Sequence, residues 1–314
     1  MTDRQKLSEL IKQKAAALGF DLCGIAKARV LSEAELVLRR WCDTGMNDKM
    51  GYLSRDIDKR VNPASLFPDA RSVVVTGTGY FTEPKQEAPG VPMISRYAYG
   101  NKYQDVITGK LEELLGYIKA VDQDADGKAV CDSAPFLEKR WAVEAGLGWQ
   151  GRHSIVINRE IGSFFFIGIL ILNLELEYDK PVTKGYCGEC RLCIDQCPTS
   201  AINDDYTIDA RKCISNLTIE NRNPVPEEFI PLLEGRIYAC DKCQEVCPWN
   251  KGASQHKHPE FEISSELAGM KREEWAGLTA EKFKKLFSES PVGRVKFERF
   301  RTNLQAILKN QERF

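Results

Sequence analysis

The spacing of apolar residues predicts an opening helix and a mixture of buried strands and helices in the first half of the chain. Positions 7, 10, 11, 14, 17 and 18 follow the helical period, and Gly19 then ends the pattern as a C-terminal glycine does. Residues 72–76 (SVVVT) are β-branched and flanked by turn formers, which indicates a buried strand. A second helical period is carried by Leu111, Leu114, Leu115 and Ile118.

Further along, the pattern predicts a helix near residues 135–146 and strands at 154–158 and 164–172. Helices and strands thus alternate to about residue 177, then cysteines and prolines take over, and from about residue 259 the sequence is charged and helical. The expected fold class is α+β. We expect an α/β layered domain at 1–178, a ferredoxin-like domain at 179–255 and a basic helical C-terminal segment at 256–314.

Composition and charge narrow the range of functions. The 314 residues are 43% hydrophobic and 28% charged with a net charge of −1, which is typical of a globular protein and excludes any argument from overall basicity. Residues 281–314 nevertheless carry nine Lys or Arg against four Glu, so a polyanion is expected to bind at this end. Neither a signal-like N-terminus nor an apolar run of membrane-spanning length is visible, and we therefore expect a cytoplasmic protein without membrane contact.

Eight of the 11 cysteines lie between Cys187 and Cys247, which in a reducing compartment indicates metal binding. The first run reads C-x2-C-x2-C-x3-C-P, and the second reads C-x2-C-x3-C-P. In two-cluster ferredoxins the last cysteine of each run ligates the other cluster. The same rule predicts two [4Fe–4S] clusters here. Cluster one is expected on Cys187, Cys190, Cys193 and Cys247, and cluster two on Cys197, Cys213, Cys240 and Cys243.

Zinc is the alternative for these thiols, because C-x2-C pairs also serve tetrahedral zinc sites. Two Cys-Pro endings and three closely spaced thiols in one run favour iron–sulfur clusters instead. The other three cysteines, Cys23, Cys42 and Cys131, lie outside both runs and are expected to be buried apolar residues.

The segment 146–151 (GLGWQG) matches the dinucleotide-binding pattern G-x-G-x-x-G but in the wrong context. That pattern requires a strand before it and a helix after it. Here a predicted helix precedes it and a predicted strand follows. The glycines are therefore expected to form a tight helix-to-strand turn, with close approach to another flat ligand as the alternative.

Three segments carry a resemblance to a known family: 131–135 (CDSAP), 145–153 (AGLGWQGRH) and 213–220 (CISNLTIE). Together with the two cysteine runs, they make the chain similar to the epoxyqueuosine reductases over about residues 5 to 250. The resemblance implies an iron–sulfur enzyme that uses cobalamin to reduce epoxyqueuosine to queuosine in a tRNA anticodon. It also implies a relationship to corrinoid reductive dehalogenases.

The resemblance also assigns roles to individual residues. Asp132 matches the family's proton donor, whereas from sequence alone it is a candidate helix N-cap. Arg222 is expected to contact tRNA phosphate, and His153 to be a structural or cofactor-edge residue. Cobalamin is expected base-off, because none of the three histidines has the aspartate of a D-x-H-x-x-G loop. The expected corrinoid contacts are Arg55, Tyr97, Asp132, Ser154, Ile157 and Ser215.

The chain departs from the family pattern in two ways. Where family members carry an acid and a histidine, the segment 97–104 (YAYGNKYQ) has Lys102 and Gln104. Longer members also have a C-terminal domain of HEAT-like helices, so this chain resembles a short form. Its binding to tRNA is then expected to come from its basic tail and cluster domain.

Two other function classes stay open at this point. One is a ferredoxin-type electron-transfer protein, and the other is a corrinoid reductase of a small molecule such as an organohalide. The absence of a twin-arginine signal weighs against a secreted dehalogenase. In the enzyme hypotheses, an external low-potential electron donor is an expected partner.

Overall fold

A computed structural model describes residues 2–83, 85–86 and 90–312 of the protein. A four-stranded antiparallel sheet organises the first half of the molecule. The strand order is β1-β2-β7-β4, and each neighbouring pair is antiparallel. The two central strands, β2 and β7, pair over their full eight residues. The four strands are β1 (Leu22–Lys27), β2 (Ser72–Gly79), β4 (Gly127–Val130) and β7 (Phe165–Leu172).

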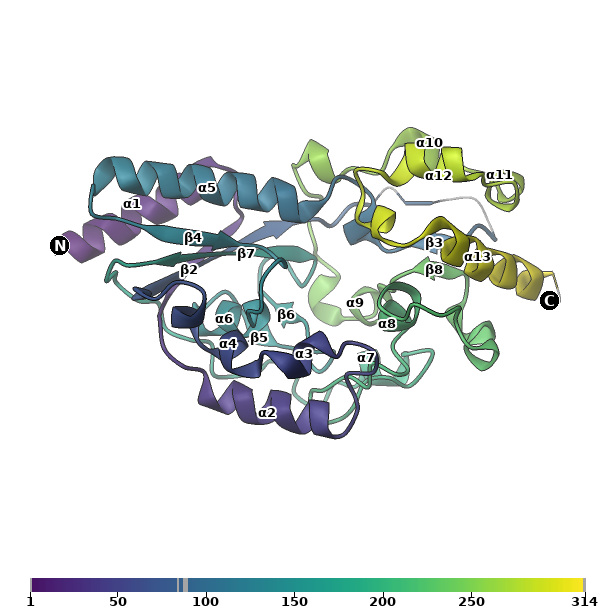
Figure 1. Cartoon of the computed structure of the whole chain (residues 1–314), viewed down its shortest axis with the longest axis horizontal. Coiled ribbons are helices and arrows are strands. Elements are labelled where there is room, and N and C mark those ends of the chain that lie inside the picture. Colours follow the sequence, from purple (N-terminus) through teal and green to yellow (C-terminus); the bar gives the residue numbers. More distant parts are fainter. Residues whose placement is uncertain (1, 84, 87–89, 313–314) are drawn as a thin grey trace.

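Helices cover both faces of this sheet (Figure 1). Val74 and Leu170 belong to the core under the long helices, whereas their neighbours Val73 and Ile169 belong to the core on the opposite face. Alternation along each strand therefore produces two apolar faces, and both need cover. One face is covered by α1 (Asp3–Ala17) and α5 (Tyr103–Val121), and the other by α2 (Ser32–Asp43), α3 (Tyr52–Arg55), α4 (Ile57–Val61) and α6 (Glu138–Glu144).

The predicted elements of this half are largely present. The first helix, the strands at 72–76 and 164–172 and the long helix around Leu111 are confirmed, with Gly19 at φ +86° after the first helix. The predicted strand at 154–158 is only β6 (Val156–Ile157), which pairs with β5 (Trp149–Gln150) in a separate hairpin outside the main sheet. The sequence pattern did not indicate β1 or β4.

The second half consists of short helices and one small sheet. In that sheet β3 (Met93–Ile94) pairs in parallel with β8 (Arg236–Tyr238). The cysteine-rich part contains α7 (Leu192–Asp195), α8 (Ile214–Ile219) and α9 (Lys242–Glu245). The C-terminal part contains α10 (Ser265–Ala268), α11 (Arg272–Ala276), α12 (Ala280–Phe287) and α13 (Phe297–Gln311).

One apolar core joins segments that were expected to be separate. It contains Ala98 from the first expected domain, Tyr238 from the second, and Trp275, Phe287 and Phe300 from the C-terminal segment. The expected boundaries at 178/179 and 255/256 therefore do not coincide with the cores. The C-terminal helices are part of the same packed unit as the end of the cysteine-rich segment.

Several charges of the basic segment 281–314 are used inside the fold. Arg299 donates hydrogen bonds to the main-chain oxygens of Leu217 and Ile219, both at 2.9 Å, and so satisfies the carboxyl end of α8. Lys282 and Lys285 each pair with a glutamate, at 3.0 Å. In the described part of the chain, no helix is both long and apolar enough to cross a membrane.

Candidate iron–sulfur and reductase site

The thiol of Cys193 is the centre of the first cysteine group. Burial raises its pKa to about 11, and three neighbouring thiols contribute to that shift through their charges. Burial also raises the pKa of Cys247, where two thiols of the first run contribute. Cys187 and Cys247 also share one small apolar core, which agrees with the four thiols lying together. They are Cys187, Cys190, Cys193 and Cys247, the set expected for cluster one.

The four thiols of the second group are all partly buried. Burial raises the pKa of Cys243 well above its ordinary value, and the charges of three further thiols add to the shift. Burial likewise raises the pKa of Cys240 to about 12, with Cys213 among the nearby charges. The members are Cys197, Cys213, Cys240 and Cys243, the set expected for cluster two.

In each group the last cysteine of one run lies with thiols of the other run. Ligation of two clusters by these two sets stays a prediction. The helices α7 and α9 lie close together in Figure 1, and each carries the turn between two thiols of one run. Among the described residues no group of three or more His, Cys, Asp or Glu side chains is arranged to hold a single metal ion. A [4Fe–4S] cubane takes one thiolate at each of four separate irons, so it requires a wider spacing.

An aromatic box borders the first cysteine group. Trp149, Tyr186 and Trp249 make edge-to-face contacts with centroid distances of 4.9 to 6.3 Å. Ile157 is fully buried in the same small core, beside Cys247. Ile157 was expected to contact a corrinoid, but the whole residue, main chain included, is buried in this structure.

Ser154 and Ser215 lie at the edges of the cysteine-rich segment. Ser154 has a left-handed main chain (φ +60°) and donates its hydroxyl hydrogen bond to the carbonyl of Tyr206 at 2.5 Å. Ser215 is in the first turn of α8, where its main-chain N–H and its hydroxyl both lower the pKa of the neighbouring Cys213, against the larger effect of burial. Ser215 is therefore placed beside cluster two.

A groove of about 380 Å³ brings Arg55 and Arg222 together. They come from α3 and from the segment after α8, which are far apart in the sequence. Tyr52 also borders the groove; burial raises the pKa of its phenol, and the charges of Glu220 and Asp132 contribute. The charge of Asp132 therefore reaches Tyr52 at the border of the groove, although Asp132 is not one of the lining residues. Its lining residues are Lys49, Gly51, Tyr52, Arg55, Glu220, Asn221, Arg222 and Asn223.

Asp132 does not cap a helix. The helix that follows, α6, has Leu137 at its N-cap, five residues further on, and no side chain caps it. Instead the Oδ2 atom of Asp132 accepts hydrogen bonds from the hydroxyl of Tyr103 at 2.5 Å and from the Nε2 atom of Gln104 at 3.2 Å. The cap alternative is wrong because the chain turns between Asp132 and the helix, which leaves the carboxylate exposed next to α5.

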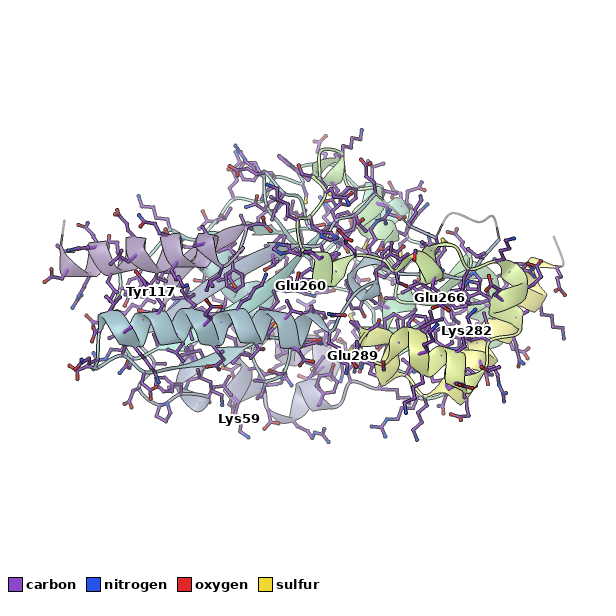
Figure 2. All side chains as sticks on the ribbon, turned by 90° about the horizontal axis from the view of Figure 1, so that it is seen from above. Lys59, Tyr117, Glu260, Glu266, Lys282 and Glu289 are labelled. Carbon is purple, nitrogen blue, oxygen red and sulfur yellow. The ribbon has the colours of Figure 1, made fainter. Side chains whose placement is uncertain are left out.

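One of the two residues that replace the family's acid and histidine therefore contacts Asp132. Gln104 donates to the carboxylate directly. Lys102 acts through its main chain, whose N–H donates to the carbonyl of Glu289 at 2.6 Å, while Asn101 donates to the carbonyl of Glu260 at 2.7 Å. Figure 2 shows Glu260 and Glu289 beside the start of α5. The segment after the second cysteine run thus fixes the start of helix α5, whose first residue is Tyr103.

Further aromatic and charged residues lie near Tyr103 and Asp132. Tyr97 lies 6.1 Å from both Tyr103 and Tyr238, measured between ring centroids, and burial raises its pKa well above the ordinary value. Arg294 pairs with Glu220 at 2.9 Å. Tyr97 was a candidate from the sequence alone, whereas Tyr103, Glu138 and Arg294 were not. Tyr103 lies inside the flagged segment 97–104, whereas a glutamate at the start of a helix gives no distinguishing signal.

The histidines lie away from the groove. His153 is only 3% exposed, and burial lowers its pKa to about 4, so its ring is neutral. Its Nδ1 atom accepts the N–H of Ile155 at 3.2 Å, and its Nε2 atom is buried without a hydrogen-bond partner. His256 and His258 are buried next to Phe261. All three are described by the structure, and none lines the groove.

The glycine segment 146–151 makes the tight turn that its context indicates. Helix α6 precedes it, strand β5 begins inside it, and strand β6 follows it. Gly146 has φ +79°, and a Cβ atom on Gly148 would lie 2.1 Å from the carbonyl oxygen of Ile157. Packing alone explains these glycines. Of the cysteines outside the two groups, Cys131 is buried and Cys23 and Cys42 are partly buried.

Comparison with known families defines the class of protein first. Residues 186–250 match the model of the 4Fe-4S double cluster binding domain. The two cysteine groups therefore belong to an iron–sulfur protein with two clusters, built onto a layered domain with a four-stranded sheet. The match covers all eight cysteines of the two groups, in agreement with their arrangement in the structure.

The particular family follows from the rest of the chain. Residues 60–133 match the model described as epoxyqueuosine reductase QueG, DUF1730. An epoxyqueuosine reductase of Cellulophaga algicola is 43% identical over 307 residues, which cover 98% of this chain and 100% of the relative. The chain belongs to the epoxyqueuosine reductase family.

Two solved structures support this assignment. A crystal structure of epoxyqueuosine reductase with an epoxyqueuosine-modified tRNA-Tyr stem loop superimposes with a TM-score of 0.89 at 28% identity, covering 97% of this chain and 81% of that one. The Bacillus subtilis enzyme, solved with its aspartate-bearing catalytic loop swung out of the active site, gives a TM-score of 0.87 at 28% identity, covering 97% and 82%.

Proposed function

We propose that this protein reduces epoxyqueuosine to queuosine in tRNA, with two [4Fe–4S] clusters in its electron path. The observation that carries the proposal is the position of Asp132. An exposed carboxylate lies beside an open groove, in the same chain as the double cluster domain. The similarity to a structure holding an epoxyqueuosine-modified stem loop supports the same substrate.

The reaction needs both halves of the molecule. Converting an epoxide to an alkene and water takes two electrons and two protons. Cys187, Cys190, Cys193 and Cys247 would hold cluster one, and Cys197, Cys213, Cys240 and Cys243 would hold cluster two. The bound clusters would supply electrons one at a time. Asp132 supplies a proton to the departing oxygen as a general acid. Its exposure beside the groove gives it access to a substrate.

The lining of the groove suits part of a cobalamin. Arginine, tyrosine and amide side chains can hold its amide and phosphate groups, and no histidine lines the groove to ligate cobalt from below. A bound cobalamin supplies a low-potential metal centre, base-off and without a protein histidine. The proposed contacts are Arg55, Tyr97, Asp132, Ser154, Ile157 and Ser215.

The partners follow from the same chemistry. Arg222 is exposed on the groove and is proposed to pair with a phosphate of the tRNA. An external low-potential donor supplies the electrons. Because the proposed substrate is a tRNA, we expect the enzyme in the cytoplasm.

The decisive test is anaerobic turnover of tRNA that carries epoxyqueuosine. The protein is reconstituted with iron and sulfide, reduced chemically, and assayed with and without added cobalamin. We expect queuosine in the digested tRNA only when cobalamin is present. Queuosine formation without cobalamin would remove the corrinoid from the proposal. Failure to form queuosine in a fully loaded protein, combined with turnover of an organohalide, would favour the small-molecule reductase instead.

A further inference from the structure

Asp132 is held in an unfavourable main-chain conformation. Its φ is +49°, in the left-handed region that residues with a side chain seldom occupy. The residue is exposed, and the four residues after it form no regular element. Such a conformation persists only where neighbouring groups fix it. The contacts that Asp132 makes therefore decide where its carboxyl points.

The side chain of Asp132 is fixed from helix α5. The Tyr103 hydroxyl donates to its Oδ2 atom at 2.5 Å, and Gln104 donates to the same oxygen at 3.2 Å. Tyr103 is itself immobilised, because its ring stacks on Phe166 of the central strand β7 with a centroid distance of 4.3 Å and an interplanar angle of 3°. The carboxylate is thus tied to the rigid sheet through one aromatic pair.

The main chain of Asp132 is fixed from helix α6. The Oε1 atom of Glu138 accepts a hydrogen bond from the Asp132 N–H at 2.5 Å. Glu138 is the first residue of α6, and that helix is anchored in the core by Trp141 and Ala142, both fully buried. The two attachments come from opposite faces of the sheet, since α5 covers one face and α6 the other.

We propose that Tyr103 and Glu138 are positioning residues that hold Asp132 in the geometry needed for proton transfer, with Gln104 taking the place of the family's histidine as a second donor. The inference rests on the proposed role of Asp132 as proton donor. Tyr103 fixes the carboxyl group, and Glu138 fixes the left-handed main chain beneath it. Neither residue is required to transfer a proton itself.

The ionisation of both residues agrees with these roles. Burial, followed by the charge of Asp132, raises the pKa of Tyr103 far above its ordinary value, so the hydroxyl stays protonated and donates. Burial also raises the pKa of Glu138 to about 8. Glu138 is therefore largely neutral at pH 7, and a carbonyl-type oxygen accepts the Asp132 N–H. The amide oxygen of a glutamine can replace that oxygen.

Hydrogen exchange tests the attachment independently of activity. In the cluster-loaded protein, the peptide that contains Asp132 is compared in wild type, Glu138→Ala, Glu138→Gln and Tyr103→Phe. We expect faster exchange at the Asp132 amide in Glu138→Ala, by about tenfold or more, and near-wild-type exchange in Glu138→Gln. Equal exchange in Glu138→Ala and wild type would overturn the role of Glu138 whether or not the enzyme reduces epoxyqueuosine.

Single-turnover rates with epoxyqueuosine tRNA test the catalytic consequence. Misplacement of a reacting group by about 1 Å can cost on the order of 100-fold. We expect Tyr103→Phe and Glu138→Ala to lose about 10- to 100-fold in rate, and Glu138→Gln to stay within about threefold of wild type. A Glu138→Gln protein with normal exchange but the slow rate of Glu138→Ala would show that Glu138 transfers protons, which contradicts a positioning role.

Two further variants serve as matched controls. Tyr117 lies on the same helix, 14 residues along and so about 21 Å from Tyr103, and Figure 2 shows it on the side of α5 next to α1. Tyr117→Phe should leave the rate and the Asp132 exchange unchanged. Gln104→His should keep the rate within about threefold, whereas Gln104→Ala should lower it. Equal rates for Tyr103→Phe and Tyr117→Phe would overturn the role of Tyr103.

Discussion

Asp132 is the residue where a structural and a catalytic role give different experimental results. Asp132→Asn keeps the shape of the side chain, and its amide oxygen can still accept the hydroxyl of Tyr103. We therefore expect folding, iron content and cofactor binding to survive. The single-turnover rate should fall by ~10²–10⁴, because a positioned general acid has been removed. A rate within threefold of wild type, in protein with full iron and cobalt, would remove Asp132 from the mechanism.

Glu138 makes stability depend on pH. Burial raises its pKa from 4.5 to about 8, and the charge of Asp132 raises it while Lys139 opposes it. Between these pH values the folded state binds more protons than the unfolded state, so this group makes the free energy of unfolding fall as pH rises. We expect Glu138→Gln to remove that fall. Denaturant unfolding of both proteins from pH 5 to 8.5 measures it; parallel curves would contradict the raised pKa.

At the scale of elements, helix α8 connects the chain between the cysteine runs to cluster two. Cys213 is the N-cap of α8, and the N–H groups of Ser215 and Asn216 lie at its thiol. We expect Cys213→Ala to reduce iron from about eight to about four atoms per chain, because cluster one keeps all four of its thiols. Iron analysis with electron paramagnetic resonance checks this. Unchanged iron would disprove the assignment of Cys213.

Helix α13 stabilises the part of the molecule that carries cluster two. Phe300 is 1% exposed and packs against Phe283, Phe287 and Trp275 in the core that also contains Tyr238. Phe300→Ala should lower the free energy of unfolding by about 3–5 kcal/mol. Arg301→Ala, an exposed change on the same helix, is the control. Equal stabilities measured by urea unfolding would mean that α13 is a dispensable tail.

Because α13 packs in this core, deleting the basic segment 281–314 would not be a clean test of whether that segment binds RNA. A truncation after Glu281 would expose the core around Tyr238 and Trp275, so weaker RNA binding could not be separated from unfolding. Arg299 also satisfies the end of α8. Single charge changes on exposed residues are therefore the suitable probes of RNA binding.

At the scale of the whole molecule, binding of RNA should depend on the cations at the groove. Arg222 and Arg55 border it together with Lys49. Removing one cation that pairs with a phosphate should flatten the plot of log affinity against log salt by about one unit. We expect this for Arg222→Ala with an anticodon stem loop, measured by fluorescence anisotropy. Lys128→Ala, on the edge strand β4, is the control. An unchanged slope would mean that Arg222 is a solvated charge.

Local patterns in the sequence were enough to predict the main elements and the metal chemistry. The strands around Val74 and Leu170 and the helix around Leu111 were predictable, because a buried face imposes a local period on the chain. The double cluster domain was predictable because cubane ligation requires short spacings between cysteines. The resemblance to the family placed Asp132 among the catalytic candidates.

How these parts work together depends on the tertiary fold. The hydrogen bonds that Asp132 makes with Tyr103 and Glu138 join helices on opposite faces of the sheet. The C-terminal helices complete a core with residues 91–99, and Arg299 becomes a helix cap. Each of these contacts joins residues distant in sequence or depends on how the intervening chain turns. Local periodicity and spacing report which face of an element is buried, but not which distant side chain it meets there.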